Sequence, residues 1–159
     1  MASSTSENNW AYPPVSYHFE VSVGQFSGVD NLFSEVSGLE MELETTTELK
    51  EGGNNSYVHH LPGRTKYTDL VLKRGVVPKK SNLLRWCQET ITGNYTKKIK
   101  TRTITVKLLD EAGKPLISWN FKNAYPKKLA LSNLNAKASG ESAIMIETIT
   151  IAYSEFERQ

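Results

Sequence analysis

Strict alternation of apolar and polar residues recurs along this chain and limits what it can fold into. In the segment SYHFEVSV, residues 16–23, every second residue is apolar and the residues between are polar. Side chains of an extended strand point alternately to its two faces, so this pattern predicts a strand with one buried face. The segments LEMELETTTEL, residues 39–49, and RTITVKLL, residues 102–109, alternate in the same way. A mostly β domain is therefore expected.

Further strands are predicted along the chain. RTITVKLL is followed by the turn DEAGKP, where Gly113 can adopt a left-handed conformation, and then by LISWNFK, residues 116–122. This order predicts a β-hairpin. The segments KYTDLVLK, KLALSNL and AIMIETITIAY predict three more strands. The last carries apolar side chains on both faces, so we expect it at the centre of a sheet or covered on both sides.

The segment SNLLRWCQETITGN, residues 81–94, lacks the alternation and predicts a short helix. Ser81 is a suitable N-cap, and Gly93 a suitable stop. Leu84, Cys87 and Ile91 then share one apolar stripe, which would lie on the sheets. Cys87, the single cysteine, is therefore expected to be a core side chain rather than a nucleophile.

These segments fit one domain. The fold class predicted is mostly β: two packed antiparallel sheets, a sandwich or barrel, with one flanking α-helix, over residues 15–159. The polar residues 1–14, which end in Pro13-Pro14, predict a flexible N-terminal arm. That start lacks the features of a secretory signal, so synthesis and assembly in the cytoplasm are expected. The net charge of +2 gives no general attraction to nucleic acid.

The segment EGGNNSYVHHLPGRTKY, residues 51–67, contains fragments typical of active sites, but none is complete. Its glycines lack the spacing of a phosphate-binding loop. The adjacent His59 and His60 would point to opposite faces of an extended chain, which disfavours a shared metal. No serine elbow or cysteine–histidine signature occurs, and glutamate spacing alone does not support a carboxylate pair. We therefore predict no catalytic residue, metal site or cofactor, and no enzyme.

Charge is segregated along the sequence. The segment from Glu35 to Glu51 contains six glutamates and one lysine. The segment from Arg64 to Lys107 contains twelve lysines or arginines and only two acidic residues, Asp69 and Glu89. One interpretation is that the fold interleaves these charges into ordinary surface pairs. The other is that the acidic side of one subunit meets the basic side of an identical neighbour, a heterologous contact that builds rings or filaments.

Several motifs follow one another in a recognisable order: HFEVSVG, LFSEVSGLEMELE, EGGNN with LPGRTKYTDLVLKRG, LLRW, LLDEAGKPLISWNF, NAYPKKL and AIMIETITIAYSEFER. Over residues 15–157 the chain resembles the tail tube proteins of contractile-tailed phages and of phage-tail-like contractile injection systems. The resemblance implies six subunits in a ring, with their strands joined into a continuous β-barrel. Rings would stack into a rigid hollow tube that is driven through a target envelope and conducts cargo.

The resemblance also implies partners: other copies of the chain, a sheath protein, baseplate and tube-terminating proteins, and cargo or a tape-measure protein in the lumen, with no specific nucleic acid binding. The particle would be a phage tail, or an extracellular or membrane-anchored injection device. A tube-initiating or tube-capping baseplate adaptor of the same fold is an alternative, and a type VI secretion tube protein is a more distant relative. A glycan-binding β-sandwich, with Trp10, Tyr12 and Tyr57 as exposed aromatics, is an alternative from another class.

Two sets of residues are predicted to serve assembly. Glycines allow the 51–67 loop to reach a neighbour, and cations would dock on acidic groups there. The predicted inter-subunit residues are Glu51, Gly52, Gly53, Asn54, Asn55, Arg64, Lys66, Lys73 and Arg74. The predicted lumen-facing residues are Glu40, Glu42, Glu44, Thr103, Thr105 and Lys107.

Overall fold

The computed structural model describes residues 13–49, 52–53, 59–77, 80–93 and 96–159. Most of the predicted N-terminal arm, residues 1–14, lies outside this part of the chain. The strands are β1 (Phe19–Val23), β2 (Glu35–Ser37), β3 (Met41–Leu49), β4 (His59–Tyr67), β5 (Leu70–Gly75), β6 (Arg102–Leu109), β7 (Pro115–Leu131), β8 (Ile146–Ala152) and β9 (Glu155–Arg158). The helices are η1 (Gly28–Asn31), α1 (Asn82–Thr92) and η2 (Gly140–Ala143).

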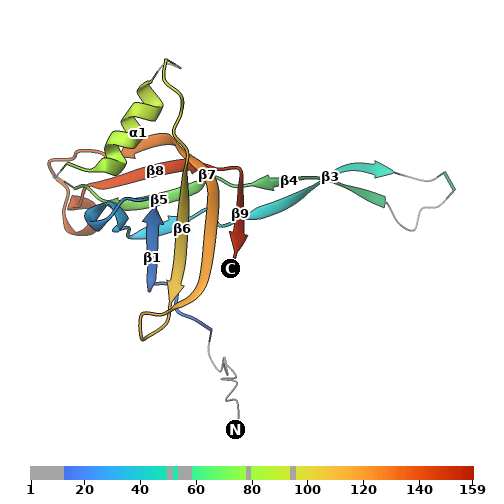
Figure 1. Ribbon diagram of the computed structural model, residues 1–159, viewed down its shortest axis with the longest axis horizontal. Helices are drawn as coiled ribbons and strands as arrows, with labels where there is room; N and C mark the ends of the chain where they lie inside the picture. The colour runs from blue at the N-terminus through green and yellow to red at the C-terminus, as the bar shows by residue number, and fades with distance from the viewer. Residues whose placement is uncertain (1–12, 50–51, 54–58, 78–79, 94–95) are drawn as a thin grey trace, which may run out of the picture.

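The body of the molecule is two antiparallel layers that share strand β7 (Figure 1). We call β1-β6-β7-β9 layer A and β7-β8-β5-β2 layer B. Strand β7 has 17 residues and passes from one layer to the other near Asn123, whose φ is 53°. Asparagine tolerates this left-handed conformation, and its Nδ2 donates to Ser154 Oγ at 3.1 Å. The two strands predicted as LISWNFK and KLALSNL are therefore one bent strand.

The hydrophobic core lies between the layers. The buried apolar residues include Val21, Val23, Ile104, Val106 and Phe121 from layer A and Leu70, Leu72, Ile149 and Ile151 from layer B. The period-2 patterns predicted for β1 and β6 are confirmed, as is the hairpin of β6 and β7. Strand β8 lies between β7 and β5, so its predicted central position is also confirmed. The predicted fold class is correct.

Helix α1 covers one side of the core and has the predicted ends. Ser81 Oγ accepts a hydrogen bond from the backbone N–H of Leu84 at 3.3 Å, and Gly93 follows the last turn. The predicted apolar stripe is wrong, because Leu83, Trp86 and Cys87 form the buried face and Ile91 is 43% exposed. Trp86 covers the larger apolar area and thereby sets which face turns inward.

Two strand predictions need correction. Tyr17, predicted to share the inner face of β1, precedes the strand and is 82% exposed. The segment KYTDLVLK is not one strand, because β4 ends at Tyr67 and β5 begins at Leu70. Asp69 lies between these two strands and close to Gly38. A Cβ added to Gly38 would be 2.0 Å from the carbonyl oxygen of Asp69. The chain passes at this point from the body into a projecting ribbon.

Candidate assembly surfaces

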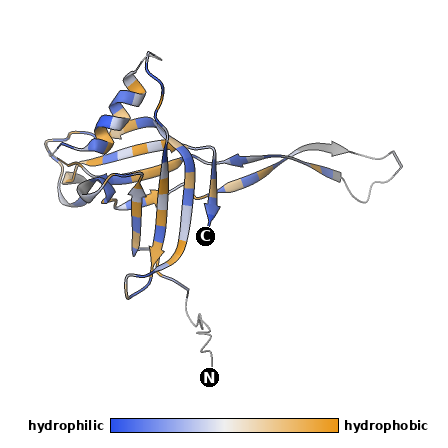
Figure 2. Cartoon of the chain, in the orientation of Figure 1, coloured by the Kyte–Doolittle hydropathy of each residue, from blue (hydrophilic) through white to orange (hydrophobic). Residues whose placement is uncertain are grey.

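Strands β3 and β4 form a separate two-stranded ribbon, the arm, which projects far from the body (Figure 1). Apolar and polar residues alternate along it (Figure 2). The 51–67 segment therefore contains a strand, His59–Tyr67, rather than only a loop. An isolated two-stranded ribbon is marginally stable in water, so a free arm of this length requires support.

One face of the arm is apolar and uncovered. Leu39, at its base, is 37% exposed, and Met41 and Leu43 are 57% and 53% exposed. The prediction that these residues share a face agrees with the register, in which Met41 pairs with Tyr67 and Leu43 with Thr65. The prediction that this face is buried within the subunit is wrong. Contiguous exposed apolar side chains mark a surface that another molecule covers.

The other face of the arm carries charges of both signs. Glu42 lies opposite Lys66 in the register, and Thr68 Oγ1 donates to Glu40 Oε2 at 3.1 Å. Glu44 and Arg64 are exposed on the two strands. Residues opposite one another on an antiparallel pair share a face, so Glu42 and Lys66 balance each other. This face is therefore mixed rather than purely acidic.

The base of the arm is fixed by aromatic contacts. The Tyr67 ring lies 5.8 Å from that of Tyr153 and 5.7 Å from that of Phe156, centroid to centroid. Tyr153 Oη donates to the carbonyl oxygen of Thr68 at 2.6 Å. Burial raises the pKa of Tyr153 to about 12, so this donor keeps its proton across the physiological range. The direction in which the arm leaves the body is thus set by the core.

At the tip of the arm, Gly52 and Gly53 form an exposed turn. Gly53 has a φ of 92°, a conformation that favours glycine. The predicted contact residues Glu51, Asn54 and Asn55 lie outside the described residues.

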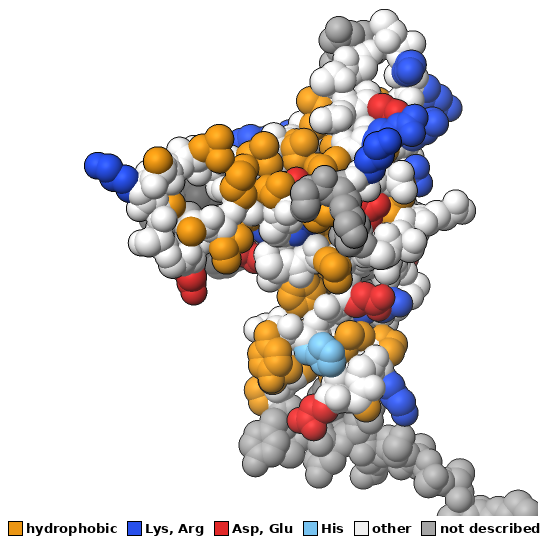
Figure 3. All heavy atoms as spheres, turned by 90° about the vertical axis from the view of Figure 1, so that its left-hand side faces the viewer, with side chains coloured by type: hydrophobic (Ala, Val, Ile, Leu, Met, Phe, Trp, Pro, Cys, Tyr) orange, Lys and Arg blue, Asp and Glu red, His pale blue; other side chains and the backbone are white. Residues whose placement is uncertain are grey.

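The end of layer B away from the arm is also apolar. By register, β7 ends there at Leu131, β8 begins, β5 ends and β2 begins. Four large side chains are exposed around it: Leu32 (66%), Leu131 (57%), Leu134 (82%) and Ile144 (61%). Figure 3 looks onto this end and shows hydrophobic side chains gathered there. We call these four residues the apolar end.

The outer face of layer A is polar throughout its described strands. Thr103, Thr105 and Lys107 of β6 lie on it, because their neighbours Ile104 and Val106 are buried. By register, the face continues into Glu20 and Ser22 of β1, Ser118, Asn120 and Lys122 of β7, and Glu155 and Glu157 of β9. Thr105 Oγ1 donates to Asn120 Oδ1 at 2.8 Å, and Lys122 Nζ donates to both β9 glutamates at 2.7 and 3.1 Å. Hydroxyls, amides and paired charges give this face nearly balanced charge.

Arg74 is not on the surface, so its prediction as an inter-subunit residue is wrong. It is 1% exposed, and its Nε donates to Glu147 Oε2 at 2.9 Å. Its Nη2 donates to Ser81 Oγ at 3.1 Å, and Ser81 in turn hydrogen-bonds to Asp30. Its position follows from β5, where alternate residues turn toward the core. Lys73, the preceding residue of β5, points to the opposite face and is exposed. Its Nζ lies 2.9 Å from Glu35 Oε1 of the same subunit.

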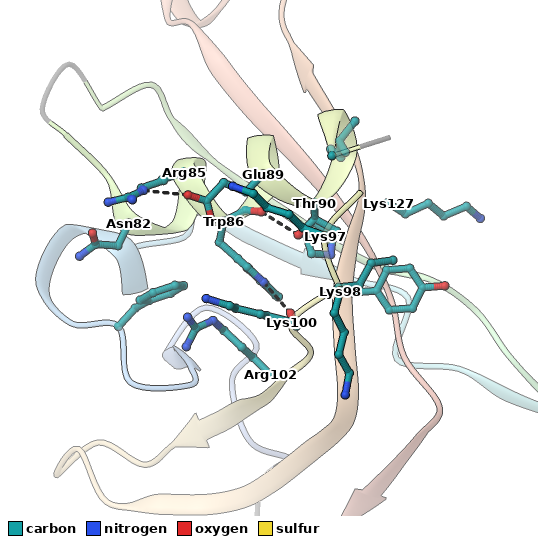
Figure 4. Close-up of a pocket in the computed structure, with 16 residues that line it drawn as sticks. Asn82, Arg85, Trp86, Glu89, Thr90, Lys97, Lys98, Lys100, Arg102 and Lys127 are labelled. Carbon is teal, nitrogen blue, oxygen red and sulfur yellow. Dashed lines mark hydrogen bonds and ion pairs between the residues drawn. The ribbon is translucent and has the colours of Figure 1, made fainter. Parts of the chain in front are cut away.

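A basic groove lies between α1 and the segment that leads into β6. It is a hollow of about 700 Å³. Six cationic side chains line it: Arg85, Lys97, Lys98, Lys100, Arg102 and Lys127. Figure 4 shows Arg85, Lys97, Lys100 and Arg102 around Trp86, whose Nε1 donates to the carbonyl oxygen of Lys100 at 2.8 Å, whereas Lys127 points away from them. The excess of cations is evident in the sequence, but their convergence is not, because the segment 97–102 has no regular periodicity.

Neither a metal cluster nor a membrane-spanning helix is found in the described part of the chain: no three His, Cys, Asp or Glu side chains converge there, and no helix is long and apolar enough to span a membrane.

The sequence over residues 15–157 matches the family described as T4-like virus tail tube protein gp19. Among solved structures, the chain is similar to one from the sheath-tube complex of an extracellular contractile injection system, PVC, in the extended state. That chain has 29% identity and a TM-score of 0.77, with 99% of each chain covered. A chain from the tube-terminating cap of the anti-feeding prophage has 26% identity and a TM-score of 0.78, with 100% of this chain and 99% of that chain covered.

A more distant likeness shows only the fold. Hcp1 from Flavobacterium johnsoniae has 14% identity and a TM-score of 0.52, with 89% of this chain and 94% of that chain covered. No curated protein matches the sequence. The identity and TM-score are higher for the contractile injection system chains than for Hcp1. This order agrees with the sequence motifs, which resemble the phage-tail-like proteins more than the type VI secretion tube protein.

Proposed function

Because the chain belongs to the T4-like virus tail tube protein family and is a tube protein of a phage tail or contractile injection system, we propose that its subunits join head to tail in hexameric rings. The rings stack into a hollow tube that a sheath surrounds and that conducts cargo. The task is mechanical, and no catalysis is involved. The chain is made in the cytoplasm and becomes part of a phage tail or an injection particle.

The arm carries this proposal. It exposes an apolar face on Met41 and Leu43, and it leaves layer B at the end opposite to the apolar end. A projection at one end of a subunit and an apolar surface at the other suit a heterologous contact, which builds closed rings or open filaments. We propose that the arm of one subunit is covered by the next and that Leu131, Leu134 and Ile144 are part of the acceptor. Arg64 and Lys66, exposed on the arm, are available for the same contact.

The polar face of layer A is the proposed lumen wall. Its residues Thr103, Thr105 and Lys107 belong to a continuous polar surface of four strands. A wall of hydroxyls, amides and paired charges offers passing cargo no strong site at which to bind. Glu40, Glu42 and Glu44 lie beside or on the arm, away from this surface, and are the less favoured lumen candidates.

A tube-capping or tube-initiating subunit is the second candidate. It is supported by the likeness to the anti-feeding prophage cap, which is as extensive as that to the sheath-tube chain. Such a subunit would form a ring but not stack on both sides. The glycan-binding alternative depends on Trp10, Tyr12 and Tyr57, all of which lie outside the described residues.

Negative-stain electron microscopy of the purified chain tests the proposal. Stacked sixfold rings are expected for a tube subunit, and single rings for a capping subunit. Particles that stay monomeric at high protein concentration would contradict both.

A charged substitution on the arm tests the contact itself. The double variant Met41→Lys, Leu43→Lys should keep the wild-type melting temperature, because both side chains are exposed in the subunit. It should form no tubes, because two ammonium groups would be buried without partners. The matched control is Val15→Lys, Tyr17→Lys, which makes the same charge change at two exposed apolar residues outside the arm. If the arm variant forms tubes as the control does, the arm is not the contact.

A further inference from the structure

Many charged side chains of the body are paired within the subunit, whereas four neighbouring cations of the basic groove are not. The surface ion pairs include Glu35–Lys73, Glu20–Lys107, Lys127–Asp69 and Lys122 with Glu155 and Glu157. Among the described residues, Lys97, Lys98, Lys100 and Arg102 form no ion pair. Within the described part of the chain, four cations without an ion pair therefore lie close together at one site, whereas Lys114 and Lys137 are single lysines without an ion pair elsewhere.

Arg102 is held in place on an aromatic floor. Its guanidinium carbon lies 4.3 Å from the centroid of the Phe26 ring and 5.6 Å from that of Trp86. Its Nε is buried and has no hydrogen-bond partner among the described residues. Cation–π contacts fix the side chain without neutralising its charge. An orientated, uncompensated guanidinium is a ready site for a carboxylate.

The one carboxylate within the groove shows the effect of this environment. Arg85 donates to Glu89 at 2.9 Å and lowers the pKa of that carboxyl, and Lys100 and Lys97 lower it further. A carboxylate is thus favoured in its charged form at this position. Glu89 extends from α1 at one edge of the groove, and Lys98 and Arg102 lie farther from it than Lys97 does (Figure 4).

The groove suits a polypeptide better than a nucleic acid. Single-stranded nucleic acids stack their bases on open aromatic rings, whereas the Phe26 and Trp86 rings are covered by Arg102. Exposed apolar side chains, Ile91 and Ile99, line the groove between the cations. A peptide that alternates carboxylates with apolar side chains would complement both kinds of lining.

A second copy of the chain is a poor complement, because its described carboxylates outside the arm and layer A that lack an ion pair, such as Glu111 and Glu141, are few and lie on separate segments. The glutamates of the arm lie among Arg64 and Lys66, with Glu42 directly opposite Lys66. Those of layer A are already paired with lysines of the same subunit. An acidic segment of a different protein fits the groove instead.

We propose that the basic groove is a docking surface for an acidic segment of a partner protein, held by Arg102 and the lysines at 97, 98 and 100. The identity of the partner rests on the proposed function, under which we assign the segment to the sheath subunit. The groove then serves attachment to the sheath, whereas the arm and the apolar end serve assembly of the tube.

Fluorescence anisotropy with a synthetic probe tests the docking chemistry directly. The probe is a labelled peptide of about ten residues that alternates Glu and Ala, long enough to span several cations. It should bind the wild-type chain, and binding should be lost near 1 M salt, where the Debye length is about 3 Å. A peptide with Gln in place of Glu should not bind. Equal binding of the Gln peptide, or tighter binding of an oligothymidine of the same length, would overturn the proposal.

Variants locate the site. Lys98→Glu, Lys100→Glu should weaken peptide binding at least about tenfold, because two attractions become repulsions. The control Lys114→Glu, Lys137→Glu makes the same change in net charge at exposed lysines elsewhere and should bind as wild type. Arg102→Gln should weaken peptide binding similarly. If Arg102→Gln unfolds, the Lys98→Glu, Lys100→Glu variant alone decides the result. Equal loss in the control and groove variants would overturn the proposal.

Electron microscopy of the same variants separates this inference from the proposed function. The Lys98→Glu, Lys100→Glu chain should form tubes as the wild type does. Loss of tubes in that variant but not in the control would overturn the inference, because the groove would then serve contacts between copies. If the wild type forms no tubes, the proposed function fails, while the peptide measurements still decide whether the groove binds acidic segments.

Discussion

Arg74 is a charged side chain in the interior, and its contacts connect four elements. It bonds to Glu147 of β8 and to Ser81, the N-cap of α1, and lies 3.8 Å from Asp30 of η1. A buried ion pair gives little net stability over an apolar pair, but loss of one partner leaves a charge without compensation. The residue therefore specifies how helix and sheet join more than it stabilises them.

Removal of one partner is predicted to be costly. Glu147→Gln and Arg74→Met should each lower the free energy of unfolding by about 3–5 kcal/mol, measured by urea denaturation. The double variant Arg74→Met, Glu147→Leu should recover only part of that loss, because the buried carboxylate of Asp30 also loses the guanidinium. The control Lys73→Gln, at the neighbouring exposed residue, should change it by less than about 1 kcal/mol. Equal small effects in all variants would contradict the role given to this pair.

Cys87 makes stability depend on pH in the alkaline range. Burial raises the pKa of its thiol to about 12, although the charge of Arg74 opposes the shift. The unfolded thiol ionises near pH 8.5. Above that pH the unfolded state gains from ionisation while the folded state does not, so the free energy of unfolding falls as pH rises from about 9 to 12. Well below pH 8.5, at about pH 7 or lower, the thiol is neutral in both states and contributes no pH dependence.

The comparison with Cys87→Ala isolates this effect from other groups that titrate above pH 9. Between pH 9 and 10.5 the wild type should lose up to about 1 kcal/mol per pH unit more than the variant, measured by urea denaturation. Parallel pH profiles for the two proteins would show that the thiol ionises freely in the folded state.

At the scale of elements, the base of the arm depends on Gly38. Its φ is 88°, and a Cβ there would lie 2.0 Å from the carbonyl oxygen of Asp69. Gly38→Ala should therefore lower the free energy of unfolding by about 3 kcal/mol or more. Gly113→Ala is the matched control, since Gly113 has a φ of 78° but open space around it. Its cost should be only about 1–2 kcal/mol, which is the conformational part alone.

The two glycine variants should also differ in assembly. Gly38→Ala displaces the point where the arm leaves the body, so tubes should be reduced even under conditions in which the subunit is folded. Gly113→Ala lies in the turn between β6 and β7 and should assemble normally. Electron microscopy of both variants below their melting temperatures measures this difference. Normal tubes from folded Gly38→Ala would show that the arm tolerates a change in its direction.

Sequence periodicity predicted the elements whose partners lie within the subunit. The alternation around Ile104 and Val106 gave the correct inner face of β6, and Ser81 and Gly93 gave the ends of α1. Periodicity could not show that the same alternation at Met41 and Leu43 belongs to an arm. An apolar face has the same sequence pattern whether it packs against its own chain or against another. The long-range contact of Gly38 with Asp69 has no periodic signature either.

Individual site residues were less predictable than elements. Lys73 and Arg74 are adjacent cations in the sequence, yet one lies on the surface and the other in the core. The alternation of Leu70 and Leu72 in β5 places Arg74 on the inner face, but its partner Glu147 is 73 residues away in the sequence, and only tertiary packing brings the two together. The groove cations at Lys98, Lys100 and Arg102 converge through a segment without regular structure, which no periodic pattern identifies.

At the scale of the whole molecule, the fold largely resolves the charge segregation seen in the sequence. Glu35 pairs with Lys73, and Glu42 lies opposite Lys66, so acidic and basic segments meet within one subunit. The two surfaces proposed for contacts between subunits, the exposed face of the arm and the apolar end, are mainly apolar. Among the described residues, cations without an ion pair are clustered at the basic groove. High salt should therefore weaken binding at the groove and leave tube assembly intact.

A salt series measures this contrast. At about 1 M NaCl charges on the surface are screened beyond about 3 Å, whereas apolar burial is not weakened. Tubes should persist under these conditions, and sulfate should favour them further, since it strengthens the burial of apolar surface. The variant Arg64→Glu, Lys73→Glu should likewise retain tubes in high salt. Sedimentation and electron microscopy follow assembly, and release of subunits as NaCl rises would instead show that ion pairs of Arg64, Lys66 or Lys73 hold the rings together.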